Sequence, residues 1–279
     1  MQQQDTGKFR KQTADKFYTK PIIATQCIGT ILSMLPQLES YQWIEPSVGG
    51  GAFLRALPPQ IDTVCIDIEP APGLPGTILR GDFLLWKPTL TKPCIVFGNP
   101  PFGRQGSAAK AFIKHASTFA DIIAFILPRS FTKPSMSRSF PREFHCIYTC
   151  EIDDNAFEVN DKPYDVPCIF QIWEKRATLR DLPSKVDAQG YTYIKDDSHR
   201  DIAFRRVGVY AGRAFDATTG IHSVESHYFL ALDPQYRPHI HVIIDKINAH
   251  IFPSNTVGPR SLSKSEANIV INQILLEFD

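Results

Sequence analysis

The stretch Ile95-Val96-Phe97-Gly98-Asn99-Pro100-Pro101-Phe102-Gly103 decides the fold. It contains an apolar run that stops abruptly before two consecutive prolines. Its first half has the β-branched and aromatic residues that are typical of a buried strand. Asn99 and the prolines then end the strand, since proline fixes φ and cannot donate to a ladder. A strand-ending turn is the simplest interpretation of these residues, and the rest of the chain decides whether they also carry chemistry.

The same turn offers two hydrogen-bond acceptors and a flat ring. The side-chain oxygen of Asn99 and the backbone carbonyl of Pro100 can accept from an amino group, and a planar base can stack on Phe102. An exocyclic amino group is a poor nucleophile because its lone pair is delocalised into the ring. Two aimed acceptors draw that nitrogen towards a tetrahedral geometry, so the turn favours chemistry on the amino nitrogen of a base.

The composition is that of an ordinary globular protein. The 279 residues are 43% hydrophobic and 21% charged, which suits one large α/β domain with a smaller appendage. A formal net charge of +1 provides no overall field for nucleic acid, so such contact needs a local basic patch. No apolar run reaches the roughly 18 residues of a membrane span, and the polar start lacks a signal-peptide core. We therefore expect an intracellular protein of the cytoplasm or nucleus, without a membrane partner.

The cysteines and histidines do not form a metal-binding pattern. The six cysteines lie mostly in apolar runs, so we expect reduced thiols in the core. Cys146 and Cys150 are the one close pair, and neither a second pair nor a histidine stands at zinc spacing. His239 and His241 are more typical of a surface pair than of a ligand set. We expect no metal.

Apolar runs alternate with helix-like segments over the first 176 residues. A helix is expected over 21–35, beginning at Pro21, and another over 107–119, with Ser107 as N-cap. The expected strands are residues 42–45, 63–68, 77–79, 94–98, 122–127, 144–151 and 167–173. This alternation predicts an α/β fold with a Rossmann-like, doubly wound, mostly parallel sheet between helices. Ligands of such sheets bind beyond the carboxyl ends of the strands.

Both ends of the chain depart from this pattern. The first sixteen residues are polar and rich in Lys and Arg, which predicts a flexible basic arm. Beyond Lys175 the sequence is charged and rich in turns, and helices are expected over 240–252 and 263–278. We therefore predict an arm at 1–16, a main domain at 17–176 and a small α+β C-terminal region at 177–279.

Glycines and carboxylates follow the first three expected strands, where a ligand would bind. The run Gly49–Gly51 lets the backbone turn tightly and approach a ligand closely. Asp67 ends the second strand, where a carboxylate can accept both hydroxyls of a ribose, with Glu69 as the alternative. Asp82 and Phe83 follow the third strand and offer a carboxylate and an apolar ring to an adenine. A turn explains each feature alone, but their order along the chain is far more specific.

The glycine run, Asp67 and the pair Asp82-Phe83 follow one another along the chain and precede Asn99 to Phe102. Motifs in this order resemble those of S-adenosylmethionine-dependent amino-methyltransferases, especially the γ-type adenine-N6 DNA methyltransferases. Phe17-Tyr18-Thr19-Lys20-Pro21 is similar to the N-terminal motif of that family. The resemblance implies a class I methyltransferase fold and S-adenosyl-L-methionine as cofactor. The cofactor-binding residues that it implies are Tyr18, Thr19, Glu45, Pro46, Gly49, Gly51, Asp67, Asp82 and Phe83.

The resemblance covers roughly residues 16 to 174. The segment 153–157 is similar to the one that places a second aromatic ring against an extruded base, which makes Phe157 the candidate and Tyr164 the reserve. Gly50 departs from the family, in which an aspartate or another polar residue is common. The C-terminal region is also short for a domain that recognises a long target sequence.

The resemblance further implies a reaction, namely direct methyl transfer to N6 of a flipped adenine in DNA. Its catalytic residues would be Asn99, Pro100, Pro101 and Phe102. Nucleic acid would contact Arg205 and Arg206 in the C-terminal region, because Arg side chains grip phosphates. Nearby residues of the same kinds are Lys195 and Arg213, with the rings of Tyr191, Tyr193, Phe204 and Tyr210. A solvated face of a small sheet explains these C-terminal residues equally well.

Three other functions would use some of the same residues. An RNA adenine-N6 methyltransferase, acting on ribosomal RNA or mRNA, would need the same catalytic motif. A protein-glutamine methyltransferase also uses Asn-Pro-Pro-aromatic, usually with Tyr, and Phe102 together with the segment 17–19 weighs against it. An inactive, methyltransferase-like subunit that binds nucleic acid would be expected to have lost a motif, and none is visibly lost.

Overall fold

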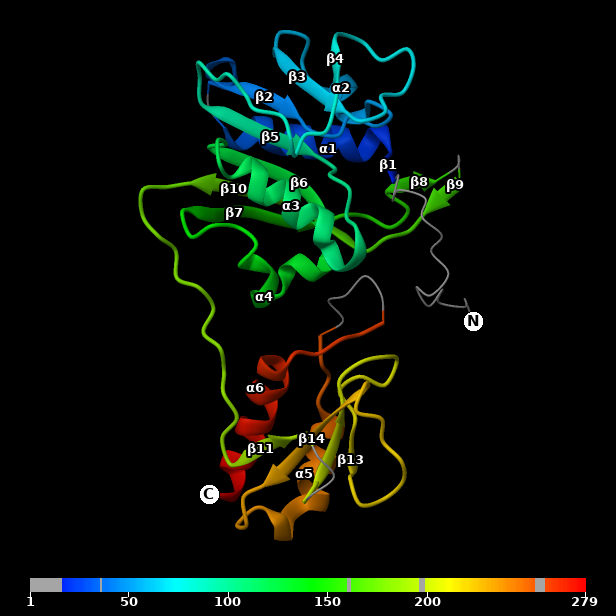
Figure 1. The fold of residues 1–279 in the computed structure, drawn as a ribbon, viewed down its shortest axis with the longest axis vertical. Helices are drawn as coiled ribbons and strands as arrows, with labels where there is room; N and C mark the ends of the chain where they lie inside the picture. The colour runs from blue at the N-terminus through cyan, green and yellow to red at the C-terminus, as the bar shows by residue number, and fades with distance from the viewer. Residues whose placement is uncertain (1–16, 36, 160–161, 196–198, 254–258) are drawn as a thin grey trace. The chain divides into compact units, whose positions relative to one another are not determined.

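The computed structural model describes residues 17–35, 37–159, 162–195, 199–253 and 259–279. The chain folds as two compact units that divide after Leu182 (Figure 1). Each unit has a hydrophobic core of its own. The expected arm at 1–16 lies outside the described residues. No helix of the described part is long and apolar enough to cross a membrane.

The larger unit is built on one seven-stranded sheet with the order β4-β3-β2-β5-β6-β10-β7. Its strands are β2 Gln42–Glu45, β3 Thr63–Asp67, β4 Ile78–Arg80, β5 Cys94–Gly98, β6 Ile122–Pro128, β7 Phe144–Glu151 and β10 Cys168–Lys175. Neighbouring strands are parallel from β4 to β6, whereas β10 runs antiparallel to both of its neighbours. This mostly parallel order, with an antiparallel last strand inserted beside the edge, is that of the class I methyltransferase sheet. The predicted fold class is confirmed.

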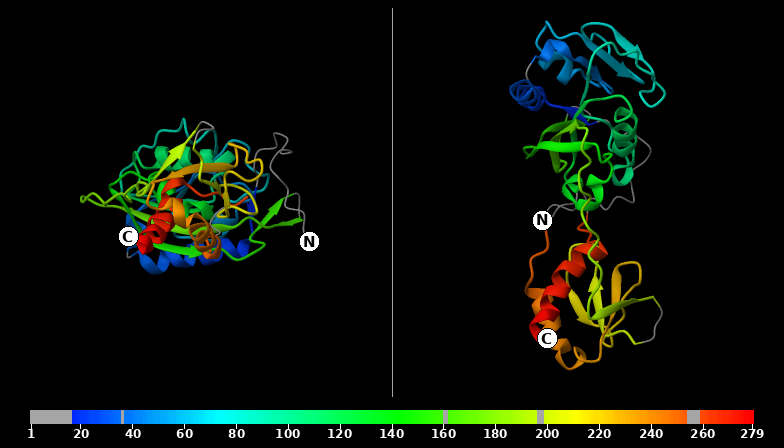
Figure 2. Two further views of the ribbon diagram at one scale, coloured as in Figure 1. Left: turned by 90° about the horizontal axis from the view of Figure 1, so that it is seen from below. Right: turned by 90° about the vertical axis from the view of Figure 1, so that its left-hand side faces the viewer.

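Helices cover both faces of this sheet (Figure 2). They are α1 Pro21–Met34, α2 Ala52–Ala56, α3 Ser107–Ala116 and the short α4 Pro134–Ser137. Successive side chains of β5 point to opposite faces of the sheet, so this strand contributes to the packing on both faces. Phe97 contacts Phe53 of α2 with 6.2 Å between ring centroids, whereas Val96 belongs to the core cluster that Phe112 of α3 joins. Short 3-10 helices lie at η1 Leu38–Ser40, η2 Arg104–Gly106 and η3 Arg129–Thr132.

The two expected helices of this unit are present, but the expected cap of the second is wrong. Pro21 begins α1, where its missing N–H is not needed. Ser107 is already the first helical residue of α3, and the N-cap position belongs to Gly106, whose φ is 72°. Gly106 adopts this left-handed conformation at little cost because it has no side chain. The residues after Ala116 continue as turns, so α3 is shorter than expected.

A second, three-stranded sheet was not predicted. It is formed by β1 Tyr18–Thr19, β8 Phe157–Val159 and β9 Lys162–Tyr164, in the order β1-β8-β9. Thr19 pairs with Phe157 across one ladder, and Phe157 pairs with Tyr164 across the next. This small sheet therefore joins the start of the described chain to the segment that follows β7.

The C-terminal unit packs two helices on a four-stranded antiparallel sheet of order β11-β14-β12-β13. Its elements are β11 Tyr191–Ile194, β12 Ile202–Arg205, β13 Ala214–Asp216, β14 His227–Leu232, η4 Arg237–His239, α5 Ile240–Ala249, α6 Lys264–Leu275 and η5 Leu276–Phe278. Fully buried side chains from both layers, such as Leu230 and Ile271, form the core. Both expected C-terminal helices are present, each with a somewhat earlier end.

Ser263 provides a test of helix capping. Its hydroxyl accepts from the N–H of Glu266 at 3.3 Å, and the Glu266 carboxylate accepts from the N–H of Ser263 at 2.9 Å. Because both bonds satisfy free helix-end donors, Ser263→Ala is expected to lower the free energy of unfolding of the C-terminal unit by about 1 kcal/mol. Ser107→Ala is the matched control, with little expected effect. Urea denaturation of the full chain measures both, and equal losses would contradict the assignment of Ser107 to a helical position.

Candidate active site at the carboxyl ends of the strands

The strands β2 and β5 are neighbours in the sheet although β3 and β4 lie between them in the chain. The winding reverses at this pair, and open α/β sheets bind ligands in the crevice beyond such a switch point. Glu45 ends β2, Gly98 ends β5, and Asn99 follows directly. The hydroxyl of Ser47 donates to the carbonyl of Asn99 at 3.1 Å and ties the two loops together.

The amide of Asn99 is oriented by the segment that contains β1. Its Nδ2 donates to the carbonyl of Phe17 at 3.2 Å and to Oγ1 of Thr19 at 3.0 Å. Its Oδ1 is buried and has no hydrogen-bond partner among the described residues. A buried acceptor without a donor costs free energy. The arrangement therefore leaves one acceptor ready for a donor on a ligand.

Glu45 presents a second acceptor of this kind. The residue is 1% exposed, and its Oε2 has no partner among the described residues. Burial raises the pKa of the Glu45 carboxyl well above its ordinary value, and the nearby Asp67 carboxyl raises it further. An ammonium group would supply the missing donor and would stabilise the ionised form. Pro46, the next residue, is buried as well.

The glycine turn after β2 needs glycine for two reasons. Gly49 and Gly51 have φ values of 52° and 76°, a region that residues with a Cβ rarely adopt. A Cβ on Gly51 would also lie 2.5 Å from the Leu74 side chain. At Gly50 a Cβ would lie 3.3 Å from the ring of Tyr18, which therefore packs on the turn. The departure from a polar residue at position 50 thus permits a close approach by Tyr18.

The carboxylates at the end of β3 and after β4 are held by backbone N–H groups. Asp67 accepts from Gly49 and from Glu69, each at 2.8 Å. Asp82 accepts from Leu84 at 2.9 Å. The expected contacts of Asp67 with a ribose and of Asp82 with an adenine stay predictions.

Phe83 has a core position. The residue is 1% exposed, and its ring centroid lies 5.1 Å from that of Phe112 and 4.8 Å from that of His115. This packing explains an aromatic residue at position 83 without a ligand. Its expected contact with an adenine plane also stays a prediction.

Four aromatic rings gather next to Asn99. The ring centroid of Phe102 lies 5.7 Å from that of Phe17 and 6.4 Å from that of Phe157. Phe17 also stacks on Tyr164, with 5.4 Å between centroids. Phe157 is fully buried, whereas Tyr164 is 39% exposed. The structure thus brings both predicted base-contacting rings, Phe157 and Tyr164, into one cluster with Phe102. Sequence reasoning did not foresee that the Phe17 ring joins this cluster.

Arg129 was not singled out from the sequence, although it shares the signature of Glu45 and Asn99. It follows β6, the neighbour of β5, and its Nε is buried without a partner among the described residues, while Nη2 pairs with Glu151 at 3.4 Å. Of the side chains that the structure describes, only these three contain such an atom, and all three stand at or just after the carboxyl end of a sheet strand. The available signal was a charged residue directly after a wholly apolar strand.

In the C-terminal unit, the residues expected to contact nucleic acid divide into arginines that are not fully buried and rings that lie in the core. Arg206 donates to the carbonyl of Glu225 at 2.8 Å, and its guanidinium lies 5.4 Å from the ring centroid of Tyr228. Arg205 is partly buried and donates to the carbonyl of Val207 at 3.3 Å. The rings of Tyr191 and Phe204 are 3% and 0% exposed in the core. The expectation that those two rings lie among surface groups that stack on bases was therefore wrong.

Arg206 has a further cationic neighbour that the sequence did not reveal. Lys264 places its Nζ 4.0 Å from the ring centroid of Tyr193 and 5.8 Å from that of Tyr228. We call Tyr193, Arg206, Tyr228 and Lys264 the cation–tyrosine patch. Within the described part of the chain, no group of three or more His, Cys, Asp or Glu side chains could hold a metal ion.

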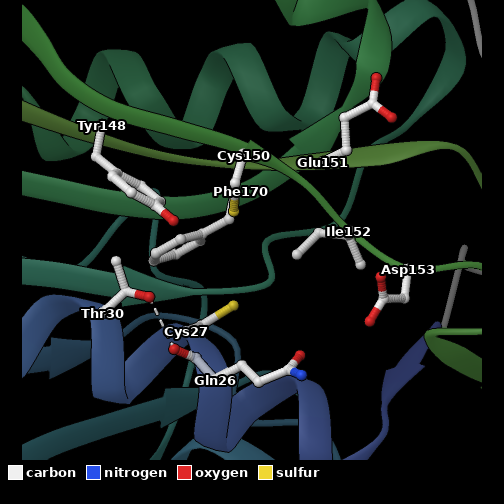
Figure 3. A pocket seen from close by; sticks show the side chains of 9 residues that line it. All are labelled: Gln26, Cys27, Thr30, Tyr148, Cys150, Glu151, Ile152, Asp153 and Phe170. Carbon is white, nitrogen blue, oxygen red and sulfur yellow. Dashed lines mark hydrogen bonds between the residues drawn. The ribbon is translucent and has the colours of Figure 1, made fainter.

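A cavity of about 250 Å³ lies between α1 and the strands β7 and β10 (Figure 3). Its lining consists of Gln26, Cys27, Thr30, Tyr148, Cys150, Glu151, Ile152, Asp153 and Phe170. Burial raises the pKa of the Cys27 thiol, which keeps that thiol protonated and unreactive. None of the predicted site residues lines this cavity.

Comparison with solved structures finds methyltransferases. A proposed RNA methyltransferase from Pyrococcus horikoshii is 16% identical, with a TM-score of 0.45 over 62% of this chain and 93% of that chain. A proposed class I S-adenosylmethionine-dependent methyltransferase from Listeria monocytogenes is 14% identical, with a TM-score of 0.44 over 62% and 65%. A methyltransferase subunit of a type I restriction-modification system from Streptococcus thermophilus is 14% identical, with a TM-score of 0.44 over 94% and 58%.

The last two matches span less than two thirds of the other protein's chain. TM-scores below 0.5 do not decide the fold, which rests on the strand order of the sheet. No protein-family model matches this chain, and no curated protein matches it in sequence.

Replacing Glu45 with Gln is expected to change how stability depends on pH. The raised pKa means that the folded state binds the proton more tightly than the unfolded state, so wild-type stability falls as pH rises above the ordinary carboxyl pKa towards the raised one. Glutamine cannot ionise, so the stability of Glu45→Gln should not show this decrease as the pH rises. Thermal unfolding without ligand between about pH 5 and about pH 9 measures the effect. Exposed Glu39→Gln is the control and should keep the wild-type slope; a wild-type slope in Glu45→Gln would contradict the assignment.

Proposed function

We propose that the larger unit transfers a methyl group from S-adenosyl-L-methionine to the N6 amino group of adenine in DNA. The observation that carries the proposal is the Asn99 amide, whose nitrogen is held by the Phe17 carbonyl and by Thr19 while its buried oxygen lacks a partner. An exocyclic amino group has the N–H donors that this oxygen lacks. The aromatic rings beside it suit a planar base better than the flexible side chain of a protein glutamine.

The residues at the switch point fit the cofactor. When bound, S-adenosyl-L-methionine supplies a methyl group that is activated by its sulfonium sulfur. Glu45 would accept from the ammonium group of the amino-acid end through its unpartnered Oε2. The glycine turn would let the backbone approach that end closely. The remaining residues proposed to hold the cofactor are Tyr18, Thr19, Pro46, Asp67, Asp82 and Phe83.

The catalytic residues would act by orientation and polarisation. Oδ1 of Asn99 and the carbonyl of Pro100 would accept the two amino protons and draw the nitrogen lone pair out of conjugation. Pro101 would keep the turn rigid, and Phe102 would stack on the base. No strong base is required beforehand, because the nitrogen becomes acidic once it is alkylated. Much of the acceleration would come from holding both reactants in line.

We propose that the C-terminal unit binds nucleic-acid phosphates through the cation–tyrosine patch. Burial lowers the pKa of the Lys264 ammonium, and the positive charges of Lys195 and Lys185 lower it further. Positive charges gathered in this way attract a polyanion, and phosphate contacts supply affinity without reading sequence. Arg205, directly before the patch residue Arg206, is proposed to support it. An adenine in RNA would satisfy the same contacts, so a substrate panel separates the two polymers.

Asn99→Ala is expected to lower methyl transfer at least about 100-fold, because it removes an acceptor aimed at the reacting amino group. Transfer of labelled methyl groups to DNA, RNA and release factor, followed by identification of the modified atom, measures both activity and substrate. Cofactor affinity, measured by calorimetry, should change little. Exposed Gln26→Ala is the amide control and should retain activity. Wild-type rates in Asn99→Ala would contradict the mechanism, and transfer to carbon-5 of cytosine or to protein would overturn the substrate assignment.

The double replacement Arg206→Gln and Lys264→Gln should weaken DNA binding uniformly across sequences. We expect the slope of log affinity against log salt to fall by roughly one for each cation that contacts a phosphate. Fluorescence anisotropy over a salt series measures it, with cofactor affinity unchanged. Lys246→Gln is the matched control in the same unit, because Lys246 already pairs with Glu277 at 2.6 Å. An equal effect of the control would show that only overall charge matters.

A further inference from the structure

The ring of Phe17 packs against the rings that are proposed to contact a base, namely Phe102, Phe157 and Tyr164. Its centroid lies 5.7 Å from that of Phe102, with 33° between the planes, and 5.4 Å from that of Tyr164, with 22° between the planes. The contact with Tyr164 is stacked, whereas the contact with Phe102 is tilted. Phe157 meets the same ring at 6.2 Å and 57°. Phe17 thus stacks on Tyr164 as a flat ligand would, and it also lies against the ring of Phe102.

Phe17 is also fixed to the amide that would receive the amino group. Its carbonyl accepts from Nδ2 of Asn99 at 3.2 Å, so Phe17 is bound to the same amide whose Oδ1 has no partner among the described residues. A base that donates to this oxygen and stacks on Phe102 needs the space that the Phe17 ring fills. Phe102, whose face is the expected stacking surface, is only 5% exposed and contacts the rings of both Phe17 and Phe157.

We propose that the Phe17 side chain is a placeholder, which fills the slot of the target base in the free protein and turns out when the base enters. The proposal rests on the proposed function of Asn99 and Phe102. The backbone that follows Phe17 is held, because Thr19 pairs with Phe157 and the N–H of Lys20 donates to the carbonyl of Ala156 at 3.0 Å. Rotation of the side chain is therefore sufficient, and the orientation of the Asn99 amide survives it.

The exchange has a physical advantage for selection. An empty apolar slot between aromatic rings would lose its packing contacts, whereas the Phe17 ring maintains them until a ligand arrives. A base that enters the slot must make stacking contacts that compensate for those that the Phe17 ring loses. A purine offers a larger face than a phenyl ring, so it replaces that stacking more fully than a pyrimidine does. Phe17 would therefore contribute to the choice of adenine over cytosine.

The test uses 2-aminopurine deoxyriboside as a probe, whose fluorescence is quenched when it stacks. Phe17→Ala should bind the probe about tenfold more tightly than the wild type, since the probe no longer competes with a ring. The KM for DNA should fall by a similar factor, because the entering base no longer has to displace a ring. Phe102→Ala should bind the probe more weakly. Phe17→Leu, which retains apolar volume without a flat ring, should be intermediate, and thermal unfolding of each variant reports on its folding.

The outcomes separate the possible roles of Phe17. Weaker probe binding in both Phe17 variants, as for Phe102→Ala, would make Phe17 a wall of the slot and overturn the proposal. Unchanged binding in both, or no binding by any variant, would overturn it as well. Probe binding requires no methyl transfer. A wild-type protein that binds the probe, with the expected gain in Phe17→Ala, but methylates no nucleic acid would support the placeholder and refute the proposed reaction.

Discussion

The site depends on the two hydrogen bonds that Nδ2 of Asn99 donates to the Phe17 carbonyl and to Thr19. They occupy the nitrogen of the amide and leave its oxygen buried and without a partner. Such an oxygen costs about 1–3 kcal/mol. The surrounding structure supports this cost, because β5 is buried over its whole length and the loop after it is tied to Ser47. Buried polar groups without partners are uncommon in native proteins, and a functional site is one place where they are tolerated.

The same reasoning extends along the edge of the sheet. Glu45, Asn99 and Arg129 stand at the ends of β2, β5 and β6, and each has one buried polar atom that no described residue satisfies. Two of these atoms are oxygens and the third is a nitrogen donor. A ligand spanning this edge would therefore meet acceptors over the switch point and a donor one strand further along. The parallel strand order creates this alignment, since it brings the carboxyl ends of all three strands to one side.

Much of the larger unit could be predicted from local patterns. The bounds of β2, β5 and β7 are those expected, because turn-forming residues stand near both ends of each strand. The Ser107 cap was wrong because a cap is set by backbone angles, and Gly106 takes the left-handed conformation just before the helix. The strands β1, β8 and β9 were missed because runs of two or three residues carry no periodicity and form only against partners distant in sequence.

The sequence by itself determined where the strands of the large sheet lie along the chain and which loops follow them, because hydrophobic alternation and turn chemistry are local. Only the tertiary structure decided which oxygen of the site lacks a donor, since the partners of the Asn99 amide lie about eighty residues away. It also placed the Phe17 ring against Phe102 and Tyr164, and it buried Tyr191 and Phe204. Burial and pairing depend on contacts between distant residues, which no local pattern contains.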